Sequence, residues 1–84
     1  MPENPLSDEQ ALAQFLEGEL ARVEVLVTLW RTHLRDGMEE EAEVARCEAT
    51  GRLAAIEESI TYLTARDKVR LEGKVSEIDK TLAA

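Results

Sequence analysis

Apolar residues recur at steps of three or four through the first half of the chain, which is the spacing of one face of an α-helix. The spacing predicts a helix from about residue 8 to residue 35. The segment from Val23 to Trp30 is the densest apolar stretch, and the helical periodicity on both sides of it favours a helix there over a strand. The predicted buried face comprises Leu12, Leu16, Leu20, Val23, Val27, Trp30 and Leu34.

A second apolar row runs beside this face. Phe15, Leu26, Leu29 and His33 lie roughly a quarter-turn further round the same helix. The apolar surface is therefore wider than one neighbouring helix would cover. We expect Leu26 and Leu29 to contact either a third helix or a partner chain.

Local signals define where the first helix begins. Ser7 and Gln10 have the spacing of a capping box, and Leu6 can pack against Ala11 as a hydrophobic staple. Residues 1–6, which include both prolines, are expected to form an irregular lead-in.

The end of the first helix predicts a short connection. Gly37 can adopt the left-handed conformation of a C-terminal cap, and Asp36 can cap the next helix together with Glu39. Short connections between helices usually join antiparallel neighbours. We therefore expect a helical hairpin.

A second helix over about residues 38–64 supplies the other half of this hairpin. Folding the chain back about Gly37 sets large residues opposite small ones, with Trp30 over Ala42 and Ala45. Such size complementarity supports the hairpin beyond simple patterning. The predicted buried face comprises Ala42, Ala45, Ala49, Leu53, Ile56, Ile60 and Leu63.

The last part of the chain predicts a third helix over about residues 67–83. Leu71, Val75, Ile78 and Leu82 form its apolar stripe. A continuous second helix would place Asp67 in the middle of an apolar face, which favours a break at residues 64–67 with Asp67 as the cap of the third helix. The fold class is therefore all-α, as a three-helix bundle or a dimeric helical bundle. The alternative is a hairpin with one long second helix that pairs with a second chain.

The back of the second helix is unusually rich in small residues. Cys47, Gly51 and Ala55 recur at steps of four and would let another helix approach closely. This row is a candidate docking site for the third helix or a seam of a homodimer. The alternative is a solvated face in which alanine serves only as a good helix former.

Length and charge narrow the class of protein. The 84 residues form one domain, 1–84, whose small core makes self-association an expectation. The net charge of −8 disfavours direct contact with nucleic acid or an anionic membrane and favours a basic protein partner. A single cysteine excludes an intramolecular disulfide, and no apolar run is long enough to span a membrane. We expect a cytoplasmic protein.

One strong acidic cluster lies at the start of the second helix. It comprises Glu39, Glu40, Glu41 and Glu43, with Glu48 one turn further on. Acidic side chains near a helix N-terminus are stabilised by the helix dipole, and they also promote solubility. The competing interpretation is a contact surface for a basic partner.

The residues that could carry chemistry are few. His33 is the only histidine, which excludes catalytic triads and two-histidine metal sites within one chain, although the hairpin would bring it near Glu40. Cys47 has no activating base in sequence and is expected to be inert. A helical enzyme pocket lined by Arg22 and Arg31 is disfavoured because Arg22 lies beside the apolar stripe, where its stem would cover apolar surface. We expect no catalysis, no cofactor and no metal.

The sequence therefore predicts a small acidic protein–protein interaction or adaptor module that forms a homodimer. The candidate interaction residues are Glu39, Glu40, Glu41, Glu43, Cys47, Gly51, Ala55, Leu26 and Leu29. The alternative is an acidic regulator, or nucleic-acid mimic, that inhibits a basic nucleic acid-binding protein.

Overall fold

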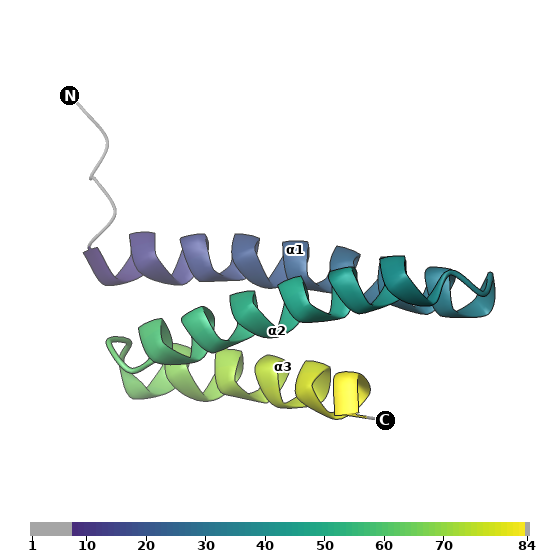
Figure 1. The fold of residues 1–84 in the computed structure, drawn as a ribbon. Coiled ribbons are helices and arrows are strands. Elements are labelled where there is room, and N and C mark those ends of the chain that lie inside the picture. Colours follow the sequence, from purple (N-terminus) through teal and green to yellow (C-terminus); the bar gives the residue numbers. More distant parts are fainter. Residues whose placement is uncertain (1–7, 84) are drawn as a thin grey trace.

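The computed structural model describes residues 8–83, which form three α-helices and no strand (Figure 1). Helix α1 spans Asp8–Arg35, α2 spans Glu39–Ile60 and α3 spans Ala65–Ala83. The predicted all-α fold is confirmed, and so are the bounds of the first helix. The capping box at Ser7, the staple at Leu6 and the lead-in lie outside the described residues.

The connection between α1 and α2 is a Schellman turn. Gly37 has a φ of +76°, which is the left-handed conformation expected of the C-terminal cap. The Met38 N–H donates to the His33 carbonyl at 2.8 Å, and the Gly37 N–H donates to the Leu34 carbonyl at 3.2 Å. These two bonds satisfy carbonyls that the end of α1 would otherwise leave without a partner.

The predicted cap of α2 was wrong. Met38 occupies the N-cap position and no side chain caps this helix. Asp36 belongs to the Schellman turn instead, where its carboxylate lies 3.5 Å from the Arg35 guanidinium. The start of α2 therefore relies on the acidic residues of its first turn to complement the helix dipole.

Helices α1 and α2 form the predicted antiparallel hairpin and share the largest contact in the molecule. The small residues Ala42, Ala45 and Ala49 are buried, as is Trp30. The Arg52–Glu19 ion pair, at 3.3 Å, shows that residue 19 of α1 lies level with residue 52 of α2. The predicted pattern fails only at the end of the first helix, where Leu34 is 47% exposed because it reaches the hairpin tip.

A break separates α2 from α3, but it lies earlier than predicted, at residues 61–64. The chain tightens there because the N–H groups of Tyr62 and Leu63 donate to the carbonyls of Ser59 and Ile60, three residues back. Asp67 is not a cap: it lies in the first turn of α3, 3.2 Å from Arg70. The Thr64 carbonyl accepts the first bond of the helix, from the Lys68 N–H at 2.9 Å. One long second helix is thereby excluded.

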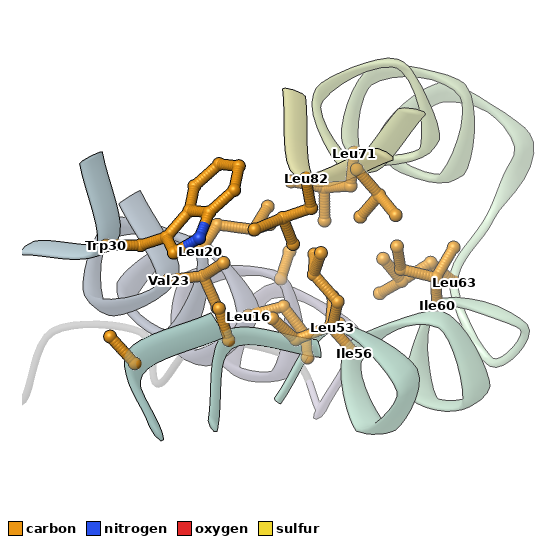
Figure 2. Packing of buried hydrophobic residues seen from close by; sticks show 14 of the residues in the cluster. Leu16, Leu20, Val23, Trp30, Leu53, Ile56, Ile60, Leu63, Leu71 and Leu82 are labelled. Atoms are coloured by element: carbon orange, nitrogen blue, oxygen red, sulfur yellow. The ribbon is translucent and has the colours of Figure 1, made fainter. Parts of the chain in front are cut away.

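Helix α3 lies along one side of the hairpin, antiparallel to α2 and parallel to α1 (Figure 1). Its buried residues Leu71, Val75 and Leu82 pack on the same core as the hairpin. Figure 2 shows Leu71 and Leu82 pointing toward the side chains of the other two helices. The bundle is long and flat, with extents of 55 × 27 × 15 Å.

Candidate interaction surface

Two contacts show which side of the hairpin α3 covers. The Glu17 carboxylate of α1 pairs with Arg70 of α3, and Glu57 of α2 lines one groove together with Asp79 of α3. We call the side that carries Glu17 and Glu57 the covered face. Successive residues of a helix are about 100° apart around its axis. The direction of each remaining residue on α1 and α2 can therefore be given as an angle from Glu17 or Glu57.

The predicted residues of α1 lie on the opposite side. Leu26 is about 180° round the helix from Glu17, and Leu29 is about 120° from it. Phe15, at about 160°, shares this side. Leu29 is 42% exposed and Phe15 is 62% exposed, whereas Leu26 packs partly against the core.

The back of α2 faces the same way. Ala55 lies about 160° from Glu57, Val44 about 140° and Gly51 about 120°. Ala55 and Gly51 are exposed, and a side chain added at Gly51 would meet no atom within 4 Å. Cys47, at about 80°, is exposed at the edge of this surface.

Helix α3 therefore does not dock on the row of Cys47, Gly51 and Ala55, and that part of the prediction was wrong. The row offers little apolar area, while the buried side chains Leu53 and Ile60 offer more to an apolar stripe. The structure instead joins this row to Leu26 and Leu29 on one surface, which we call the open face. It comprises Phe15, Leu26, Leu29, Val44, Gly51 and Ala55.

Phe15 and Val44 were not among the predicted site residues, although Val44 is 68% exposed. The sequence could have identified both residues from their positions around the helix axis. Phe15 lies on the second apolar row of its helix, and Val44 precedes Gly51 by two turns. What the sequence lacked was the position of α3.

The charged side chains near the middle of the open face are paired with one another. Arg22 lies 3.7 Å from Glu19, and Arg52 lies 3.3 Å from Glu19 and 3.2 Å from Glu48. Two arginines and two glutamates make this network neutral. The middle of the open face therefore carries no net charge.

The predicted acidic cluster surrounds the hairpin tip. Glu39, Glu40 and Glu41 are exposed and form no ion pair within residues 8–83. Glu43 differs, because its carboxylate lies 3.3 Å from Arg46. The cluster is brought together only by its position in the first turns of α2.

Neither His33 nor Cys47 belongs to a catalytic arrangement. His33 is half-buried and forms no ion pair with Glu40 among the described residues. The Cys47 thiol is exposed and lies 3.7 Å from the Glu43 carboxylate. A negatively charged neighbour does not provide the electropositive surroundings that activate a thiol. Across the part of the chain that the structure describes, no three His, Cys, Asp or Glu side chains are grouped so as to hold a metal ion.

A groove between α2 and α3 holds Glu57, the one carboxyl among residues 8–83 whose pKa is clearly shifted. Burial raises the pKa of Glu57, and the hydrogen bond to Asp79 raises it further because two carboxylates close together disfavour both being ionised. The groove has a volume of about 390 Å³ and is also lined by Ile60 and Val75. It forms the joint between two packed helices and is separate from the open face.

Comparison with known proteins finds no matching family, no similar curated protein and no solved structure with a matching fold. None of the three described helices is both long enough and apolar enough to cross a membrane.

Proposed function

We propose that this protein is a small protein–protein interaction module of the cytoplasm, and that the open face is its binding surface. The observation that carries the proposal is that one broad side of the hairpin keeps large apolar side chains in solvent. Phe15, Leu29 and Val44 are all more than 40% exposed there. Large apolar side chains that stay in solvent on one side of a small domain are candidates for an interaction site.

The shape of the surface favours a helical partner. Helices α1 and α2 run side by side, and small residues at Gly51 and Ala55 leave room for the backbone of another helix to approach. A helix placed between them would cover Phe15 and Val44 and complete a four-helix arrangement. The paired charges at the centre of the face suit binding rather than catalysis, because no charged side chain there is held without a partner.

Site-specific photo-crosslinking tests this proposal. A benzophenone amino acid replaces Phe15 on the open face, and in a matched control it replaces Val69, which is 69% exposed on α3. We expect adducts of defined mass from position 15 in the source cells and none from position 69. The proposal fails if both positions give the same adducts, or if position 15 gives none.

A second candidate function rests on the hairpin tip, where Glu39, Glu40 and Glu41 project without ion pairs among the described residues. They would suit an acidic regulator of a basic nucleic acid-binding protein. Changing all three to Gln should then abolish capture of such a partner, and raised salt should weaken capture of the parent protein. Capture that is unchanged by both treatments would rule this function out.

A further inference from the structure

We propose that the second half of α3, residues 76–83, is a strap that opens from the hairpin while the first half of the helix stays docked, and that carboxylates facing each other across the α2–α3 groove promote this opening. The strap belongs to the covered face, and its test does not depend on what the open face binds. Polar contacts, burial and the grooves beside the helix all distinguish the two halves.

The first half of α3 is tied to α1 at two places. The Thr64 N–H, just before the helix, donates to the Glu9 carboxylate at 3.1 Å. Further along, Arg70 pairs with the Glu17 carboxylate. These contacts join residues that are 55 and 53 positions apart in the sequence, so they hold the start of α3 against the start of α1.

The second half lacks such ties. Among residues 8–83, no side chain of the strap forms an ion pair, and the Thr81 hydroxyl donates to the Glu77 carbonyl of its own helix at 3.1 Å. Across the groove to α2, Asp79 faces a like charge, because Glu57 lines the same space of about 390 Å³. Glu72 is the third carboxylate of this groove, and its described lining includes no basic residue and no residue of α1. Ionised carboxylates at close range repel each other.

The burial of the apolar stripe also declines along α3. Leu71 and Val75 in the first half are 0% and 3% exposed, whereas Leu82 in the strap is 8% exposed and Ile78 is only partly buried. Docking is stabilised in proportion to the apolar area that is removed from water. The strap therefore has both the weaker apolar contact and the unfavourable charge contact.

A second groove, also of about 390 Å³, separates the strap from α1. Val27 of α1 and Ile78 of the strap line it, together with charged side chains that form no ion pair among the described residues: Glu24, Arg31, Lys74 and Glu77. Segments with few buried contacts and few ties open at the lowest free energy. When the strap opens, Val27 and Ile78 gain exposure, so this groove is where new apolar surface becomes accessible.

Amide hydrogen exchange followed by NMR at pH 7 tests the strap. The intrinsic rate of each amide divided by its measured rate gives a protection factor, which reports how rarely that amide opens. We expect the amides of residues 78–82 to share one protection factor, about tenfold or more below those of residues 69–73. Equal protection in the two halves, or a loss confined to the last turn as in ordinary fraying, would overturn the strap.

A pair of truncations tests whether the strap opens independently of the first half. Leu82→Ala should lower the protection of residues 78–82 about tenfold or more and leave residues 69–73 unchanged, because the lost burial lies within the strap. Leu71→Ala is the comparison variant and should lower protection in both halves. If Leu82→Ala lowers protection equally throughout α3, the helix docks as one unit and the inference fails.

Glu57→Gln tests the part played by the carboxylates. It removes a charge that faces Asp79, so protection of residues 78–82 should rise while that of residues 69–73 stays the same. Burial and the nearby Asp79 raise the pKa of Glu57, so the strap of the parent should likewise gain protection between pH 7 and pH 4. The matched control is Glu58→Gln, which changes a neighbouring carboxylate outside the groove. A strap that responds equally to both variants, or to neither, would overturn the proposed opening by the groove carboxylates.

Discussion

The two broad faces of the hairpin both carry apolar side chains, but only one of them has a neighbour in this chain. On the covered face, Leu71, Val75 and Leu82 of α3 are buried against α1 and α2. On the open face, Phe15 and Val44 remain more than 60% exposed. Helical periodicity therefore shows that a side chain lies on an apolar row, but it does not show which neighbour covers that row. A third helix with a single apolar stripe can cover only one of the two faces.

The largest expected effect on the free energy of unfolding comes from shortening a buried side chain on the covered face. Leu71 is fully buried, so Leu71→Ala should lower the free energy of unfolding by about 2–5 kcal/mol, through lost burial and the cavity left behind. Urea denaturation followed by circular dichroism measures it. Phe15→Ala, measured at a concentration too low for association, should stay within about 0.5 kcal/mol of the parent. Equal losses from the two variants would show that the faces do not differ in this way.

The next effect concerns the turn that sets the two helices of the hairpin against each other. Gly37 has a φ of +76°, a conformation that costs an L-residue with a side chain about 1–2 kcal/mol. Gly37→Ala should therefore be destabilising by about that amount in thermal unfolding. Gly73→Ala is the control, because removing a glycine from a helix interior should stabilise by about 0.5–1 kcal/mol. A Gly37→Ala variant as stable as the Gly73→Ala control would contradict the assigned turn.

The turns also show how far the sequence determines the fold. Gly37 marks the first turn unambiguously, because only that position offers a left-handed cap between two apolar patterns. The second turn contains neither glycine nor proline, and its signal was the misplaced Asp67. The break was predicted correctly for this reason, while its position was a few residues too late: the N–H groups of Tyr62 and Leu63 bond to carbonyls three residues back and end α2 at Ile60, and no residue type in the sequence marks this tightening.

The candidate site was predictable to a similar degree. Leu26 and Leu29 were recognised as a second apolar row, and Gly51 and Ala55 as a face open to close approach. Joining them into one surface required the side on which α3 packs, and sequence pattern does not contain that information. Helix α3 packs on the side of the hairpin that offers the larger apolar residues, such as Leu53 and Ile60. Only the folded hairpin brings these residues together with those of α1.

The smallest effect lies at the joint between α2 and α3, on the covered face. The pKa of Glu57 is raised from its ordinary value of 4.5 by burial and by the hydrogen bond to Asp79. A group whose pKa is higher in the folded state binds its proton more tightly there. Its contribution to stability is therefore fully present below the unfolded pKa and is lost as the pH rises through the folded pKa.

Glu57→Gln keeps a neutral donor facing Asp79 at every pH. The variant should therefore be more stable than the parent at pH 7, and the difference should shrink as the pH falls through the range in which Glu57 is protonated. Urea midpoints from pH 7 to pH 4 give this difference directly, and Glu58→Gln, which removes one negative charge from the neighbouring position, is the matched control. A Glu57→Gln variant that is less stable than the parent at pH 7 would show that the ionised pair does not weaken the docking of α3. The docking of α3 on the covered face would then depend on apolar packing alone. The two faces would differ only in which apolar side chains α3 buries.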